Sequence, residues 1–118
     1  MNGSEAGIVL QPVHNLVLVP LRGPVHADLM DDLRSKVLDY LYRQGARGIV
    51  IDMAGVEVLD EDDFEALRRV VESAALMGAP VILAGIRAGV AAGLTMLGVD
   101  DHWVRATRTV DQAMELLS

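Results

Sequence analysis

Hydrophobic residues recur along this chain at two alternating spacings, which predicts alternating helices and strands. Over residues 27–44 they fall at three- and four-residue steps with charged residues between them, as on an amphipathic helix, and Gly45 ends the pattern. The apolar positions of this helix are Met30, Leu33, Val37, Tyr40 and Leu41. Residues 48–53 then form a nearly continuous apolar run, which is typical of a strand covered on both faces.

The same alternation repeats in the second half of the chain. Asp60 is a suitable N-cap for a second helix that extends to about residue 77, before Gly78. Its expected buried stripe is Phe64, Leu67, Val70, Val71, Ala74 and Ala75. Residues 80–84 repeat the buried-strand pattern, and residues 87–97 predict a short third helix that Gly98 stops.

Two weaker strand patterns lie near the N-terminus. Residues 8–10 and 16–21 are apolar and flank the turn-prone residues 12–15, which predicts a hairpin. Pro20 has no N–H to donate to a ladder, so that end of the second strand is expected at an edge or a bulge.

The order of these elements predicts the fold class. Residues 102–105 are expected to form a last short strand, and Thr109 with Gln112 forms a capping box that opens a final helix. Strands alternating with helices imply an α/β fold with a mainly parallel sheet, to which the leading hairpin adds the antiparallel part. We expect four to five strands covered by about four helices, in one domain over residues 7–118 after a flexible lead of residues 1–6.

Composition narrows the function classes. The net charge is −7, and few aromatic residues are present, which argues against nucleic-acid binding because phosphates require clustered Lys and Arg. The chain has no cysteine, so it has no disulfide and no thiolate nucleophile or metal ligand. With neither a signal-peptide pattern nor a membrane-length apolar run, a cytoplasmic protein without membrane contact is expected.

The most informative segment is the acidic one at the start of the second helix. Six of the 17 acidic residues fall within residues 57–65, and residues 60–63 are four consecutive acids. A helix N-terminus favours anions by about 0.3 to 1 kcal/mol each, yet one capping Asp suffices for that purpose. The excess charge indicates a functional role, and the alternative is that the acids only cap and solubilise the helix.

A metal site is a weaker alternative. Asp52, at the end of a predicted strand, could hold Mg²⁺ together with Asp60, Asp62 or Asp63, as in Asp-based phosphotransferases and phosphatases. The chain's only lysine, Lys36, is expected in mid-helix, where it cannot complete such a site. We therefore expect no metal, no cofactor and no catalytic residue.

The remaining candidates have structural interpretations. The histidines, His14, His26 and His102, lie in unrelated segments and are expected to be solvated turn or cap residues. Gly85 and Gly89 flank Arg87 and could cradle an anion at the start of the third helix, or provide a tight turn and close packing.

Taken together, these segments resemble a STAS domain, the SpoIIAA-like fold of bacterial anti-sigma factor antagonists and of sulphate transporter tails. The resemblance covers residues 8–117 and rests on residues 48–53, 56–60, 78–86 and 94–99. Within the family the chain is similar to the single-domain RsbS-like proteins of the stressosome.

The resemblance implies where a regulatory phosphorylation site would lie. Asp60 would precede the phospho-acceptor, which would fall at Glu61 or Asp62, and Asp63 stands where a glycine is common. This chain has no hydroxyl between residues 60 and 65, so the usual switch should be absent there. A phosphoserine carries about −1.5 to −2 charge, which two carboxylates match in sum.

The resemblance also implies a function and a class of partner. It predicts a non-catalytic regulatory module for partner switching, signal transduction and the stress response, with anti-anti-sigma activity that regulates transcription. The partner would resemble an anti-sigma factor or a switch kinase of the histidine-kinase-like ATPase class, and self-association or a stressosome-like assembly is open. Expected partner-binding residues are Asp60, Glu61, Asp62, Asp63 and Glu65. The alternatives are the Mg²⁺-dependent enzyme and a purely structural scaffold.

Overall fold

The computed structural model describes residues 7–118, so the expected flexible lead of residues 1–6 lies outside the described residues. The elements, in chain order, are β1 (Gln11–Val13), β2 (Leu16–Arg22), α1 (Ala27–Arg43), β3 (Gly48–Gly55), α2 (Glu61–Leu76), β4 (Val81–Ala84), α3 (Ala88–Met96), β5 (Ala106–Thr107) and α4 (Val110–Leu117).

The five strands form one mixed sheet in the order β1-β2-β3-β4-β5. The β1–β2 hairpin is antiparallel, and β2, β3, β4 and β5 pair in parallel through helical or loop crossovers. The predicted α/β fold with a mainly parallel sheet is therefore confirmed. Pro20 is followed by a shift in the β2–β3 register, which confirms the expected bulge there.

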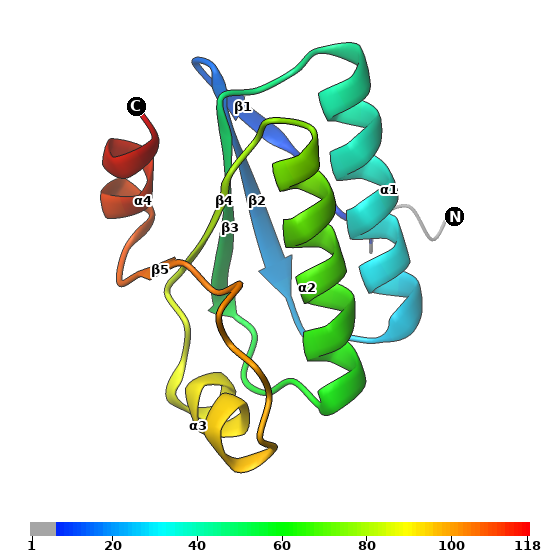
Figure 1. Ribbon diagram of the computed structural model, residues 1–118, viewed down its shortest axis with the longest axis vertical. Coiled ribbons are helices and arrows are strands. Elements are labelled where there is room, and N and C mark those ends of the chain that lie inside the picture. Colours follow the sequence, from blue (N-terminus) through cyan, green and yellow to red (C-terminus); the bar gives the residue numbers. More distant parts are fainter. Residues whose placement is uncertain (1–6) are drawn as a thin grey trace.

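Helices cover both faces of the sheet, as Figure 1 shows. The larger core lies between the sheet and the pair α1 and α2, whose buried stripes point at the alternate residues of β2 and β3. A smaller cluster lies under α4 on the opposite face and consists of Leu16, Val50, Ile82, Ala84, Ala113 and Leu117. Ala75 is exposed, contrary to prediction, because the buried stripe of α2 is centred on Leu67 and Ala74 and leaves Ala75 at its margin.

The predicted strand over residues 8–10 is wrong, because the backbone of this segment forms hydrogen bonds with side chains of α1. The N–H of Ile8 donates to Asp32 Oδ2 at 2.8 Å, and the Lys36 ammonium donates to the Ile8 carbonyl at 2.7 Å. The Ile8 side chain is buried in the larger core. With both backbone groups of Ile8 bound to α1, the first strand begins only at Gln11.

The turn between the first two strands is also shorter than predicted. Val13 pairs with Leu16, so the hairpin turn contains only His14 and Asn15. His14 adopts φ 58°, a left-handed conformation that suits such a two-residue turn.

The predicted strand over residues 102–105 is wrong as well. The Trp103 side chain is buried, and its indole N–H donates to the Asp100 carbonyl at 2.7 Å. The Val104 N–H donates to the Asp101 carbonyl at 2.9 Å, which makes a turn of this segment. Strand pairing with β4 therefore starts later, at Ala106.

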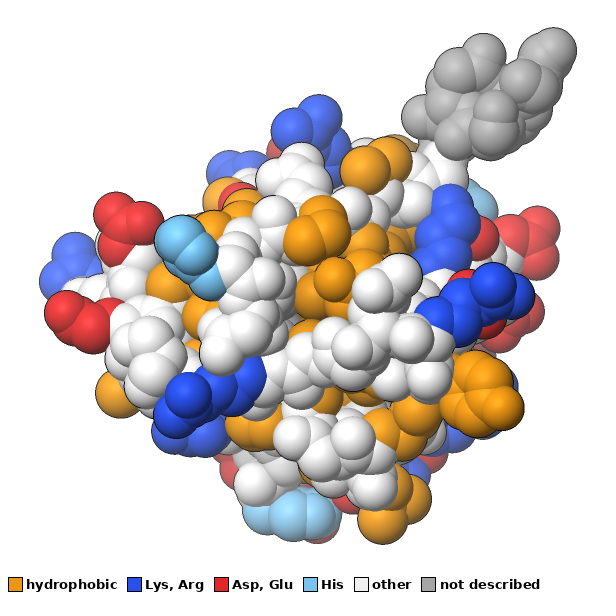
Figure 2. Space-filling model, turned by 90° about the horizontal axis from the view of Figure 1, so that it is seen from above, with side chains coloured by type: hydrophobic (Ala, Val, Ile, Leu, Met, Phe, Trp, Pro, Cys, Tyr) orange, Lys and Arg blue, Asp and Glu red, His pale blue; other side chains and the backbone are white. Residues whose placement is uncertain are grey.

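The start of α2 and the whole of α3 lie at the same end of the molecule, where the parallel strands have their carboxyl ends (Figure 1). Figure 2 views the opposite end, where hydrophobic side chains gather in the middle and charged ones lie mostly around the margin. Carboxyl ends of parallel strands are where sites collect in open α/β sheets.

Candidate functional site

The first turn of α2 is fixed by two of its own acids. Asp60 is the N-cap, and its Oδ1 accepts the Asp63 N–H at 2.7 Å. Asp63 Oδ2 in turn accepts the Asp60 N–H at 3.1 Å, which completes a reciprocal capping box. The sequence identified the cap but not its partner, although an acid three residues after the cap is the signal for this motif.

Charge repulsion and burial act on Asp63. Partial burial raises the pKa of its carboxyl, and the neighbouring charges of Asp60 and Asp62 raise this pKa further. The N–H of Asp60 opposes the rise by donating to the ionised form. Charge at this helix start is therefore already disfavoured at Asp63.

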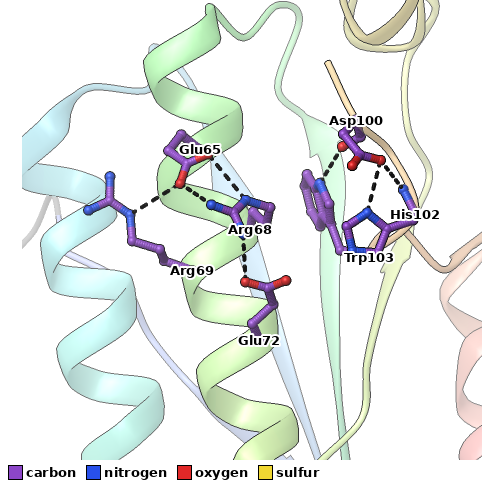
Figure 3. A network of polar contacts seen from close by, with 7 residues as sticks. All are labelled: Glu65, Arg68, Arg69, Glu72, Asp100, His102 and Trp103. Carbon is purple, nitrogen blue, oxygen red and sulfur yellow. Dashed lines mark hydrogen bonds and ion pairs between the residues drawn. The ribbon is translucent and has the colours of Figure 1, made fainter.

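Glu65 stays ionised, and its charge is compensated by Arg68 and Arg69 in the next turn of the helix. It forms hydrogen-bonded ion pairs with Arg68, one of them between Arg68 Nε and Glu65 Oε1 at 3.1 Å, and Arg69 Nε lies 3.9 Å from its other oxygen. Arg68 also donates to Glu72 at 2.8 Å, as Figure 3 shows. The hydrogen bonds from Arg68 lower the pKa of Glu65.

Glu61 and Asp62 are the two acids of the cluster that remain free. Both side chains are exposed, and within residues 7–118 neither makes a side-chain hydrogen bond or an ion pair. The structure thus divides the five predicted partner-binding residues into a mutual cap, an ion-paired Glu65 and two free carboxylates. These two lie at the positions where the family resemblance implies the missing phospho-acceptor.

A groove of about 440 Å³ separates the start of α2 from residues 98–103. Glu61, Asp62, Glu65 and Arg68 line its helix side, and Asp100 and His102 line its loop side. His102 Nδ1 lies 2.9 Å from Asp100 Oδ1, and this contact raises the pKa of His102 and lowers that of Asp100. Sequence analysis missed this loop, because no local pattern links it to a helix more than thirty residues earlier.

Exposed apolar side chains lie at the same end of the molecule as the acids. Val58, just before the cap, is 67% exposed, and Met96 at the end of α3 is 83% exposed. α3 packs against the loop before α2 through Gly89 and Gly93: a Cβ at Gly89 would overlap the Glu57 carbonyl oxygen. Of the two interpretations of the Gly85–Gly89 segment, the structure supports a tight turn at Gly85, with φ 71°, and close packing at Gly89.

Asp52 does not join the acidic cluster. Its Oδ1 accepts the N–H of Ala54 at 3.0 Å, an interaction within its own strand end. Over residues 7–118, no three His, Asp or Glu side chains lie together in a way that could hold a metal ion.

The histidines have the structural roles expected of them. His14 lies in the hairpin turn, and His26 caps α1 by accepting the Leu29 N–H at 3.2 Å. His102 is exposed in the loop beside α2. The prediction of solvated turn or cap residues is confirmed.

The family of this fold follows from comparison with known proteins. The STAS domain model matches residues 8–113, so the chain belongs to the STAS domain family. No helix within residues 7–118 is both long and apolar enough to cross a membrane.

Several known proteins are similar to this chain. The RsbT co-antagonist protein RsbRA of Bacillus subtilis is 27% identical over 112 residues, which cover 94% of this chain and 41% of that relative. A serine-to-glutamate variant of Moorella thermoacetica RsbS superposes with a TM-score of 0.80 at 24% identity, covering 93% of both chains. A chain of the stressosome, described as a signal integration and transduction hub, gives a TM-score of 0.79 at 24% identity, covering 92% of this chain and 95% of that one.

Proposed function

We propose that this chain is a non-catalytic regulatory module of the anti-sigma factor antagonist or stressosome type, in which Glu61 and Asp62 replace the phospho-acceptor. The observation that carries this proposal is that these two acids alone in the cluster are exposed and unpaired within residues 7–118. Their summed charge of about −2 matches that of a phosphoserine at a helix N-terminus. The surface is then held permanently in an imitation of the phosphorylated state.

The proposed partner contacts the start of α2 and the exposed side of α3 together. The exposed carboxylates at the start of α2 and the exposed apolar residues Val58 and Met96 at the same end of the molecule would offer such a partner both charge and hydrophobic contact area. An anti-sigma factor or a switch kinase of the histidine-kinase-like ATPase class is the partner that the family membership and the RsbRA similarity favour. The module acts in the cytoplasm, within a stressosome-like assembly or as a homo-oligomer.

A phosphorylation assay tests the missing acceptor. The protein is incubated with a switch kinase of this class and ATP, and mass spectrometry locates any phosphate. We expect none on residues 60–65, because this segment has no hydroxyl. The matched control is Asp62→Ser, which restores a hydroxyl at the exposed first turn and should accept phosphate from the same kinase. Phosphate on an aspartate of the wild-type segment would contradict the proposal and favour a phosphotransferase.

Calorimetric titration with Mg²⁺ separates the proposal from the enzymatic alternative. Clustered carboxylates without a built site should bind Mg²⁺ with a dissociation constant on the order of millimolar. Micromolar binding that Asp52→Asn abolishes would overturn the non-catalytic assignment.

A further inference from the structure

Few side chains anchor α3 to the core of the domain. Val90 is its only buried residue, and Leu94 is half-buried against the larger core. The remaining side chains of the helix face solvent, and the one at its end, Met96, is almost fully exposed. The two long helices, α1 and α2, each bury five side chains, and the eight-residue α4 buries two.

α3 is also weak as an isolated helix. It has nine residues, whereas isolated helices shorter than about 12–15 residues are marginal in water. Its N-cap, Arg87, makes no side-chain capping hydrogen bond, unlike the N-caps of α1, α2 and α4. Gly89 and Gly93 each disfavour the helical state by about fivefold relative to alanine.

Besides Val90 and Leu94, these same glycines hold α3 against the rest of the domain. At Gly89 the helix backbone approaches the Glu57 carbonyl so closely that a Cβ could not fit. At Gly93 a Cβ would lie 3.2 Å from the Phe64 ring and 3.5 Å from the Leu59 carbonyl oxygen. α3 is thus seated on the loop that leads into the acidic start of α2, and this seat requires the residue type that weakens the helix.

We propose that α3, at the carboxyl end of the sheet, is a lid: it opens by local unfolding while the sheet and the other helices remain folded. The seat on Glu57, Leu59 and Phe64 holds the lid closed, because neither helix propensity nor buried side-chain area suffices. For the partner surface, which rests on the proposed function, the consequence is that only the closed lid holds the exposed side of α3 against the loop that leads into the acidic start of α2. A partner that contacts both would therefore stabilise the closed state.

Native-state amide hydrogen exchange on the full chain, followed by NMR at low denaturant concentrations, tests the lid. The reporters in α3 are the Ala91 N–H, bonded to the Arg87 carbonyl, and the Leu97 N–H, bonded to the Gly93 carbonyl. They should exchange at least about 100-fold faster than the amide of Ile51 in β3, with little denaturant dependence. Equal rates and equal denaturant slopes for α3 and β3 would overturn the proposal.

Two variants separate the seat from helix propensity. Ala92→Gly changes an exposed α3 residue and should speed α3 exchange by about fivefold through propensity alone. Gly89→Ala improves propensity but clashes with the Glu57 carbonyl, so it should also speed α3 exchange, with Ile51 unchanged as the measure of an intact sheet. Slower α3 exchange in Gly89→Ala would show that the seat does not hold the lid. If the exchange results are as expected but no partner binds the wild type, only the proposed function fails.

Discussion

At the scale of single residues, neighbours decide what each acid at the start of α2 can do. Asp60 and Asp63 satisfy each other's backbone N–H groups, and Glu65 is held by Arg68. Glu61 and Asp62 have no such partner within residues 7–118, so among these acids they alone offer an uncompensated charge to another molecule. An acidic run in a sequence is therefore not one site but a mixture of structural and free carboxylates.

The capping box gives a prediction in which two acids respond in opposite ways. Asp60→Ala should lower the free energy of unfolding by about 1 kcal/mol, because the Asp63 N–H loses its acceptor. Asp63→Asn keeps an oxygen for the Asp60 N–H but removes a disfavoured charge, so it should raise stability at pH 7 by about 0.3 kcal/mol.

Urea denaturation at two pH values measures both effects. The pKa of Asp63 is raised in the folded state. As pH falls and this carboxyl is protonated, the free energy of unfolding of the wild type therefore rises to that of Asp63→Asn. The gain should vanish near pH 3. A loss of stability in Asp63→Asn as large as in Asp60→Ala would show that the charge itself is needed for the cap.

His102 gives a prediction with the same direction of pH dependence as Asp63, in the higher pH range where histidine titrates. Its pKa is raised by Asp100, so the pair stabilises the fold fully below the ordinary histidine pKa, and the contribution is lost as pH rises through the folded value. An NMR titration of the His102 ring should give a lower pKa in Asp100→Asn than in the wild type. An unchanged pKa would mean that Asp100 does not hold the ring in solution.

At the scale of elements, the sequence predicted what local periodicity determines. α1, α2 and α4 begin and end within a residue or two of the expected positions, because caps and apolar spacing lie within each segment. The two strand predictions over residues 8–10 and 102–105 failed because contacts between residues distant in the sequence decide the conformation of these segments. Asp32 and Lys36 of α1 bind the backbone of Ile8, and Trp103 is drawn into the core.

The candidate site was predictable to the same extent. Asp60 as cap and the acids after it follow from the sequence, because they occupy consecutive positions at one helix start. The loop with Asp100 and His102, and the seat of α3 on Glu57, arise from the crossover connections that bring distant segments to one end of the sheet. No spacing in the chain signals these contacts.

The prediction at this scale concerns the clamp that Asp32 and Lys36 of α1 form on the backbone of Ile8. The N–H of Ile8 and the nearby Lys36 lower the pKa of Asp32, so this carboxylate stabilises the fold above its unfolded pKa of about 4 and ceases to do so as pH falls through the folded value. Asp32→Asn retains an acceptor without the charge. Thermal unfolding between pH 2 and pH 6 should show a weaker pH dependence for this variant, and identical profiles would contradict the clamp.

At the scale of the whole molecule, the two ends of the sheet differ in chemistry. One end carries the acidic start of α2 and α3, and the other exposes hydrophobic side chains where α1 and α2 end (Figure 2). Tyr42 is 83% exposed and Leu76 is 90% exposed at that second end. Exposed apolar patches commonly mark association surfaces, which makes this end the candidate for self-association.

Sedimentation velocity over a range of concentrations tests this assignment. We expect the wild type to self-associate, and Leu76→Lys to weaken this association at least tenfold, because a charge would replace apolar contact area. The matched control is Met96→Lys, which changes a residue of similar exposure at the opposite end and should leave the association unchanged. An equal effect of both substitutions would remove the distinction between the ends.

The central claim is that the free charge of Glu61 and Asp62 imitates a phosphate on the partner surface. The most direct test is titration calorimetry of the kinase-like ATPase or anti-sigma factor, captured from native lysate and purified, against the double variant Glu61→Ser with Asp62→Ser. Removal of the two charges should strengthen binding by about 1 to 3 kcal/mol, the range in which charge repulsion at an interface operates. Asp28→Ser with Asp31→Ser removes the same charge from exposed positions of α1 and should leave the affinity unchanged. Equal affinities for the wild type and both double variants would contradict the claim and leave the acids as ordinary helix-start charges.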